Sequence, residues 1–275
     1  MCSWLAVSPS GFFDWRKRPQ SATASRRERL ALLIAHEFTD SDETYGYRRI
    51  HAALARSSVH CGPELVRDIM CELGLRPCQP RPWRASLTER DGTGQHLPDL
   101  LEQDFTASAP GKKMVGDITY IPTWEGWLFL ATVIDCHTKM VIGYAMGEDY
   151  KTPLIQSALR HAADRTALDP GAIFHSDRGS NYTSHEFATT ITEMDLRHSV
   201  GRTGICYDNA MAESFFAALK NERVHRTAYP TREHARRDVT RYIELWYNRK
   251  RLHSALDYRT PQEALNEWND SQVAA

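Results

Sequence analysis

Three acidic residues lie within or directly beside apolar stretches of the sequence. Asp117 lies inside the strand-like run KMVGDITYIPT, Asp177 directly follows the apolar run AIFHS, and Glu213 falls in the first turns of the helical pattern NAMAESFFAALKNERV. A carboxylate beside apolar residues is costly to desolvate unless a cation or solvent meets it. The three positions therefore raise the question of whether a metal ion, a basic partner or water compensates each charge.

Two of these acids have an ordinary structural explanation when each is taken alone. Asp177 begins the sequence DRGSN, which is typical of a turn. Glu213 near a helix start is stabilised by the helix dipole. Asp117 is the hardest to explain in this way, because an aspartate inside a strand must face water or be compensated.

The expected elements could bring two of the acids together. Residues 153–163 predict a helix of the right length to connect two parallel strands, which would place the strand ending at Asp177 beside the strand of Asp117. Two close carboxylates are stable when a cation or a shared proton lies between them. A metal ion between Asp117 and Asp177 is therefore one reading of the pair.

The helix that carries Glu213 is expected to begin near Ala210, after a cap formed by residues 207–209. Its apolar stripe leaves Glu213 and Lys220 two turns apart on nearly one line. Carboxylate oxygens from a strand middle, a strand end and a helix start suit hard cations such as Mg²⁺ or Mn²⁺. Two such ions can serve phosphoryl transfer without a covalent nucleophile, whereas the absence of a GxSxG motif disfavours a serine hydrolase.

The order of the expected elements indicates an α/β protein. Three strand-like runs joined by short turns, between Lys112 and Gly147, predict an antiparallel meander. Helix and strand patterns then alternate up to the helix near Ala210, which indicates a mixed sheet covered by helices.

The N-terminal third has a different texture. Helical patterns over residues 26–38, 47–54 and 63–73 predict a small helix-turn-helix-like module, with Gly62 and Pro63 opening the last helix. The charged residues of that helix are three acids and one arginine, a poor balance for contact with DNA. The run RPCQPRPWR after it, with three arginines and no acid, is therefore the better candidate. Residues 85–101 read as a linker.

Composition and charge narrow the class of protein. Lys and Arg number 9 against 15 acids in residues 101–213, but 11 against 5 in residues 214–260, a segregation that suits a metal in the centre and a polyanion around it. The six scattered cysteines predict no disulfide framework, although His51, His60 and Cys61 leave a zinc site open. No run is long enough to span a membrane and no secretion signal begins the chain, so we expect an intracellular protein.

The motifs together resemble one known family. The phrases DITYI, HSDRGSNY and YDNAMAESFFAALKNE, with 35 residues between Asp177 and Glu213 and Lys220 seven residues further on, are similar to the DDE transposases of insertion-sequence family 3, relatives of retroviral integrases. The N-terminal phrases WLAVSPSGFFDWRKRP and YGYRRIHAAL and the C-terminal phrase YNRKRLHSALDYRTP resemble the same family. The resemblance covers most of the chain.

The resemblance implies a fold and a division into domains. A ribonuclease-H-like core with a mixed five-stranded sheet flanked by helices follows a small all-α module. We expect a helix-turn-helix-like module at residues 1–84, a linker at 85–105, the catalytic core at 106–228 and a basic helical segment at 229–275.

It also implies roles for residues. Asp117, Asp177 and Glu213 would bind two Mg²⁺ or Mn²⁺ ions, and Lys220 would contact a DNA phosphate near the reacting end. Four further residues would shape the site: His175, Asn181, Tyr207 and Asn209. Further DNA contacts are expected at Arg67, Arg76, Arg81, Arg84, Arg249, Lys250 and Arg251.

The implied activity is hydrolysis that frees a 3′-hydroxyl at the element end, followed by attack of that hydroxyl on another phosphodiester. The partners would be the terminal repeats of the element, target DNA and further copies of the chain, in the bacterial cytoplasm and at the nucleoid. Two alternatives stay open: a DNA-binding partner or regulator that needs fusion to an upstream-frame product, and a ribonuclease-H-type nuclease.

Overall fold

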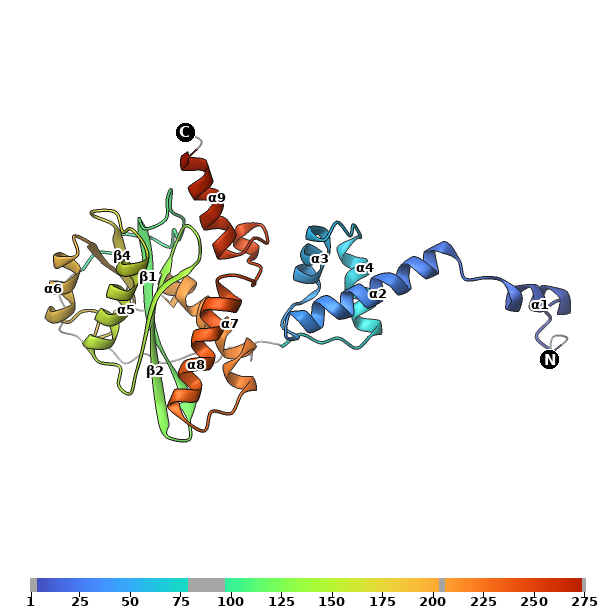
Figure 1. Cartoon of the computed structure of the whole chain (residues 1–275), viewed down its shortest axis with the longest axis horizontal. Coiled ribbons are helices and arrows are strands. Elements are labelled where there is room, and N and C mark those ends of the chain that lie inside the picture. Colours follow the sequence, from blue (N-terminus) through green and yellow to red (C-terminus); the bar gives the residue numbers. More distant parts are fainter. Residues whose placement is uncertain (1–3, 79–96, 203–205, 274–275) are drawn as a thin grey trace. The chain divides into compact units, whose positions relative to one another are not determined.

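The computed structural model describes residues 4–78, 97–202 and 206–273, and the chain divides into two compact units, residues 1–78 and 79–275 (Figure 1). The predicted DNA contacts Arg81 and Arg84 lie outside the described residues.

The first unit is all helical, as expected. Its helices are α1 (Pro9–Lys17), α2 (Ala22–Asp40), α3 (Tyr47–Arg56) and α4 (Pro63–Glu72). The last three pack on one another through buried residues such as Leu30, Ile50 and Ile69. Pro63 opens α4 and Gly74, at φ +67°, follows its end, as the sequence predicts. Helix α1 has no buried residue, and no periodic apolar pattern in the sequence predicted it.

The second unit is built on one five-stranded sheet in the order β3-β2-β1-β4-β5. Its strands are β1 (Lys113–Thr123), β2 (Gly126–Asp135), β3 (Val141–Gly147), β4 (Ile173–Ser176) and β5 (Arg197–Val200). The first three form an antiparallel meander, and β4 and β5 run parallel to β1. Helix α5 (Thr152–Arg165) makes the crossover to β4. The predicted mixed sheet and its crossover are therefore confirmed.

Helices cover both faces of the sheet (Figure 1), and two hydrophobic cores form on it. Val115 and Ile121 of β1 pack in the core that contains Phe215 and Leu219. These come from α7 (Ala210–Glu222). Met114 belongs to the other core, which contains residues of α5 and of α6 (His185–Glu193). Alternate residues of β1 thus serve opposite faces, as a strand covered on both sides requires.

The C-terminal part continues the α7 side. Helix α8 (Arg232–Arg241) runs into a π-helical segment η3 (Tyr242–Tyr247), and α9 (Pro261–Val273) ends the described chain. Short 3-10 turns are η1 (Cys206–Asn209), η2 (Val224–Arg226) and η4 (Ser254–Leu256). Across the described ranges, none of the helices has the length and apolar character that a membrane crossing requires.

Gly143 fixes how closely α5 approaches the sheet. A Cβ built on this residue of β3 meets the carbonyl oxygen of Ala158 at 2.3 Å and the backbone nitrogen of Ala162 at 2.7 Å. We expect Gly143→Ala to lower the free energy of unfolding by about 1–3 kcal/mol, because the helix backbone must shift. Chemical denaturation measures it. Gly62→Ala, where nothing lies within 4 Å, is the control, and an equal loss in both variants would contradict the packing argument.

Candidate active site

Asp117 is the fifth residue of β1 and lies two residues beyond the point where β1 loses one of its neighbouring strands. Strand β4 pairs with β1 only at residues 113–115, so Asp117 has a partner strand on one side, where it lies opposite Thr132. Its Oδ1 accepts the backbone N–H of Ile118 at 2.7 Å. The Oγ1 of Thr132 is buried and has no hydrogen-bond partner. Residues directly opposite in an antiparallel pair share a face, so this hydroxyl lies on the face of Asp117.

Asp177 and Glu213 come from the two elements that the sequence predicts. Asp177 directly follows β4 and is exposed after the fully buried Ser176, and its Oδ1 accepts the N–H of Gly179 at 3.0 Å. Glu213 lies exposed in the first turn of α7. The apolar stripe of α7, including Ala212 and Leu219, is buried as expected.

The pKa of each of the three carboxyl groups is raised, by burial first and, for Asp117 and Glu213, also by a neighbouring acid. Burial first, and then the charge of Asp177, raise the pKa of Asp117 to about 8, and Glu213 adds to the effect. Desolvation and then the charge of Asp177 raise the pKa of Glu213. Desolvation also raises the pKa of Asp177, although the residue as a whole is exposed. The acids therefore lie close enough to repel one another.

No basic side chain of the described residues forms an ion pair with any of the three acids. Across the same ranges, no three His, Cys, Asp or Glu side chains stand close enough to hold a metal ion in their present arrangement. The acids are thus electrostatic neighbours whose side chains have not converged on one point. Oxygen donors with uncompensated charge fit a divalent cation.

Lys220 is a basic residue that interacts with this site. Its Nζ lies over the ring of Tyr120, 4.9 Å from the centroid. Burial lowers the pKa of Lys220, and the charge of Asp117 opposes that effect. The predicted two-turn spacing therefore does bring Lys220 into the field of the carboxylates.

Asn209 binds the strand of Asp117 instead of capping α7. No side-chain hydrogen bond caps this helix, and Asn209 Nδ2 donates to the carbonyl oxygen of Gly116 at 3.3 Å. Its Oδ1 is buried with no partner. The capping role expected for residues 207–209 is wrong for Asn209, because its amide joins the start of α7 to β1.

His175 is fully buried and both ring nitrogens are bound. Its Nε2 lies 2.9 Å from the carbonyl oxygen of Asp208, so Nε2 carries the proton. The hydroxyl of Ser199 lies 2.7 Å from Nδ1 and donates to it, while accepting the N–H of Leu100 at 2.8 Å. Burial lowers the pKa of His175, consistent with a neutral ring. His175 thus ties β4, β5 and η1 together and does not point at a substrate.

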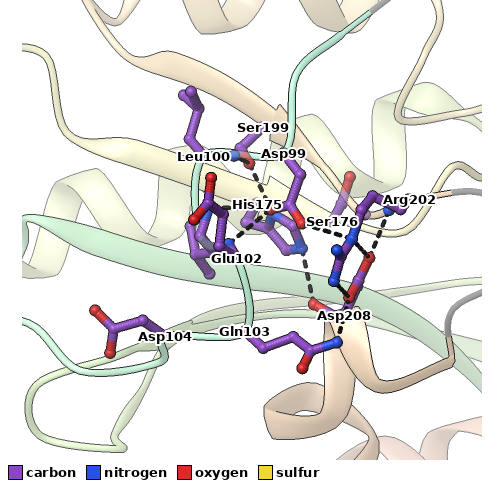
Figure 2. A network of polar contacts seen from close by, with 12 residues as sticks. Asp99, Leu100, Glu102, Gln103, Asp104, His175, Ser176, Ser199, Arg202 and Asp208 are labelled. Atoms are coloured by element: carbon purple, nitrogen blue, oxygen red, sulfur yellow. Dashed lines mark hydrogen bonds and ion pairs between the residues drawn. The ribbon is translucent and has the colours of Figure 1, made fainter.

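The same network anchors the chain before α7 (Figure 2). Asp208 accepts hydrogen bonds from Arg202 and from Gln103 Nε2, the latter at 3.0 Å. The Oδ1 of Asp99 accepts the N–H of Leu101 and of Glu102, both at 3.0 Å. Residues 97–104 fall in the segment predicted as a linker, yet Leu101 is buried in the core with α7. The described end of that segment therefore helps to position the site.

Comparison with known proteins gives the family of this arrangement. Residues 107–206 match the family described as an integrase core domain, residues 194–261 match a second integrase core domain family, and residues 25–83 match an HTH-like domain. The chain is 38% identical over 275 residues to the insertion element IS600 uncharacterized 31 kDa protein of Shigella sonnei, with 100% of both chains covered. The chain belongs to the insertion-sequence family 3 transposases.

Two further relatives are named as transposases, and one of them is the transposase of insertion sequence IS3A. The transposase InsF for insertion sequence IS3A of Escherichia coli K12 is 36% identical, with 97% of this chain and 93% of the relative covered. The transposase for insertion sequence element IS904 of Lactococcus lactis is 35% identical, with 90% and 97% covered. The transposase is accordingly an enzyme of the polynucleotidyl transferase class, and its HTH-like domain makes DNA its partner.

Solved structures similar to the transposase are retroviral integrases. The simian T-cell lymphotropic virus intasome in complex with the PP2A regulatory subunit B56 gamma is 16% identical, with a TM-score of 0.49 and 85% of this chain and 73% of that chain covered. The HTLV-2 integrase catalytic core domain in complex with magnesium is 16% identical, with a TM-score of 0.44 and 57% and 98% covered.

Arg251 of the transposase is buried, which contradicts the DNA contact that we expected there. Its guanidinium donates to both carboxylate oxygens of Glu222 at 2.7–2.9 Å. Tyr242 Oη and Trp246 Nε1 also donate to Glu222. The apolar neighbours exclude water from this pair, so the side chain cannot reach DNA. It holds the end of α7 against η3.

The remaining predicted residues are placed as follows. Arg249 and Lys250 are exposed directly after η3, and Arg76 is exposed after α4. Arg67 is exposed on α4, where it is bound to Glu64 and Asp68. Asn181 is half-buried in the turn after Asp177. The side chain of Tyr207 lies outside the described residues.

The zinc site left open by the sequence finds no support. His51 Nε2 lies 3.0 Å from the backbone carbonyl oxygen of Cys61, so this ring is already bound to backbone. No group of three metal-ligating side chains occurs in the described ranges.

Sequence reasoning missed four residues that shape the site: Asp99, Ser199, Arg202 and Thr132. For two of them the sequence held a usable signal, a polar residue inside a strand-like run. These are Ser199 in LRHSV and Thr132 in LFLATVI. Asp99 carried none, since it stood in a segment that reads as a linker.

We expect Arg251→Ala to lower the free energy of unfolding by about 3 kcal/mol or more, because it leaves Glu222 buried without its cation. Arg249→Ala, an exposed neighbour, is the control and should change it by less than about 0.5 kcal/mol. Urea denaturation followed by circular dichroism measures both. Equal, small effects would show that the buried pair does not hold α7.

Ionisation of Asp208 makes the free energy of unfolding depend on pH in the acidic range. Arg202 first, and then Gln103, hold the pKa of Asp208 at about 2, below its ordinary value of 3.8. Because the folded pKa is the lower one, the stabilisation is full above about pH 4 and is lost as the pH falls toward 2. Asp208→Asn should therefore flatten the decline in unfolding free energy over this interval. Parallel declines in variant and parent would contradict it.

Proposed function

We propose that Asp117, Asp177 and Glu213 hold the divalent metal ions with which this transposase cleaves and joins DNA at the ends of its element. The observation that carries this proposal is that the charge of Asp177 raises the pKa of both Asp117 and Glu213, while no described basic residue forms an ion pair with any of the three acids. Carboxylate oxygens are the ligands that Mg²⁺ and Mn²⁺ prefer. We propose two such ions, because a pair would serve both the attacking and the leaving oxygen in phosphoryl transfer.

Bound metal ions would supply an activated attacking oxygen and charge stabilisation for the leaving oxygen. The chain's own residues position these acids. The N–H of Ile118 fixes one oxygen of Asp117, and Asn209 binds the adjacent carbonyl oxygen of Gly116. The N–H of Gly179 fixes one oxygen of Asp177. Glu213, exposed on α7, would complete the set when its side chain turns toward the sheet.

The catalysed reaction is hydrolysis that frees a 3′-hydroxyl, followed by attack of that hydroxyl on a second phosphodiester. Lys220 would bind a phosphate oxygen beside the reacting bond, because its charge lies in the field of Asp117. The exposed Arg249 and Lys250 would contact the DNA backbone further away. Arg67, Arg76, Arg81 and Arg84 belong to the proposed contacts of the N-terminal part.

The finer partners are proposals as well. We propose that the terminal repeats of the element and target DNA are the substrates, and that two or more copies assemble on them, since two ends must be joined. A fusion with an upstream-frame product is the second proposed partner. The place of action would be the bacterial cytoplasm, at the nucleoid. We keep the proposed domains at residues 1–84, 85–105, 106–228 and 229–275.

Glu213→Gln tests the proposal on a labelled oligonucleotide that carries the element's terminal repeat, with Mn²⁺ or Mg²⁺ present. We expect nicking and strand transfer to fall on the order of a thousandfold, because the amide removes a metal-binding charge worth several kcal/mol to the transition state. Glu186→Gln is the matched control, since Glu186 is also an exposed acid in a first helical turn. It should retain activity.

If Glu213→Gln and Glu186→Gln both retain nicking and strand transfer, the metal role of Glu213 is refuted. Glu213 would then only stabilise the helix dipole. If the parent protein binds DNA but does not nick it, adding the upstream-frame product separates a regulator from half of a fused enzyme. Cleavage of the RNA strand of a hybrid, in place of DNA, would favour the ribonuclease. The family assignment favours the transposase over both alternatives.

A further inference from the structure

An exposed aromatic pair lies on the hairpin that extends from the strand of Asp117. The rings of Tyr120 and Trp127 meet edge to face, with centroids 4.7 Å apart. Tyr120 lies opposite Phe129 and Trp127 lies opposite Pro122, so both rings stand on one face of the β1-β2 ladder. Tyr120 is 52% and Trp127 is 51% exposed. Two large rings therefore present about half of their surface to solvent.

The pair stands on a fixed support. The N–H of Trp124 donates to the carbonyl oxygen of Tyr229 at 3.1 Å. Arg232 donates from its backbone N–H to Glu125 and from Nε to the carbonyl oxygen of Trp127, at 2.8 and 3.2 Å. The hairpin is thus bound to the start of α8 at three points. The two rings are therefore exposed on a hairpin that the rest of the fold holds in place.

A cation joins the pair to the carboxylates. Lys220 Nζ lies 4.9 Å from the centroid of the Tyr120 ring, and the charge of Asp117 acts on Lys220. Tyr120 follows Asp117 by three residues, roughly 10 Å along the strand, and the two side chains leave opposite faces of it, so Lys220, which interacts with both, is the residue that links them. That separation is about the distance over which one or two nucleotides extend from a reacting phosphate.

We propose that Tyr120 and Trp127 form a subsite that stacks on an unpaired nucleobase next to the reacting phosphodiester, while Lys220 holds a phosphate of the same strand. This subsite rests on the proposed function of the three carboxylates. An aromatic face accepts any base, and neighbouring positive charge attracts the backbone, which together are the features of single-strand binding.

While DNA is absent, Lys220 covers the ring of Tyr120 on which the nucleobase would stack. A cation over an exposed aromatic ring is held only weakly. A charge-assisted hydrogen bond to a phosphate is stronger, so an arriving phosphate draws Lys220 off the ring. The face of Tyr120 is then open to the base attached to that phosphate. Positive charge beside the rings favours a nucleic acid over an apolar protein surface as the occupant.

The test uses the full chain with terminal-repeat duplexes that differ only at the end, one blunt and one with its last two base pairs unpaired. 2-Aminopurine replaces one unpaired base, and the assay contains EDTA, so no cleavage occurs. We expect the parent to bind the unpaired end more tightly and to quench 2-aminopurine by stacking. The double variant Tyr120→Ala, Trp127→Ala should lose the quenching and about tenfold of the preference.

Matched variants separate stacking from other causes. Tyr120→Phe keeps a ring and should retain quenching. Trp124→Ala removes a ring that is 78% exposed in the same hairpin and should also retain it. Circular dichroism confirms that each variant folds. Equal quenching in the parent and the double variant, or equal loss in Trp124→Ala, would overturn the subsite.

Two readouts keep this proposal apart from the one it rests on. Glu213→Gln should quench 2-aminopurine as the parent does, because stacking needs no catalysis. A chain that stacks but never cleaves contradicts only the metal role. If the double variant cleaves at the parent's rate and with the parent's preference for unpaired ends, only the subsite is contradicted. Loss of self-association in that variant, with stacking intact, would identify the rings as an interface between copies and overturn the subsite.

Discussion

Repulsion among three carboxylates is the constraint around which the second unit is built. Asp117 sits within a strand where burial and two other acids raise its pKa to about 8. A fold left to its own stability would not keep such a group, since an uncompensated charge near a core costs free energy. A divalent cation of the kind that we propose for this site would offset that cost. The family assignment supplies the substrate, DNA.

The remaining structure holds the helix of Glu213 at both ends. At its start, Asn209 binds β1 and Asp208 binds Arg202, with His175 beneath them. At its end, Glu222 receives donors from Arg251 and Tyr242. Buried polar networks of this kind orient elements when every member is satisfied. The site can therefore keep uncompensated acids because the helix that carries one of them is fixed elsewhere.

Periodicity and motif spacing were enough for the architecture. The meander, the crossover and the apolar stripe of α7 each follow from local patterns, which depend only on neighbours in the chain. Helix α1 was missed because it buries nothing, so no apolar period marks it. Residues 97–104 read as linker, yet pack on the core through Leu101, because isolated loop residues show no period even when they are buried.

The sequence by itself singled out the three acids that we propose hold the metal ions, because their types, their spacing and the elements that carry them are all encoded locally. Only the tertiary structure decided what the basic residues do. Arg249, Lys250 and Arg251 are adjacent and look alike in sequence, but the first two are exposed and Arg251 is buried against Glu222. Likewise, only the fold set Lys220 over Tyr120. Which charges meet solvent depends on packing between segments far apart in the chain, and no local pattern records it.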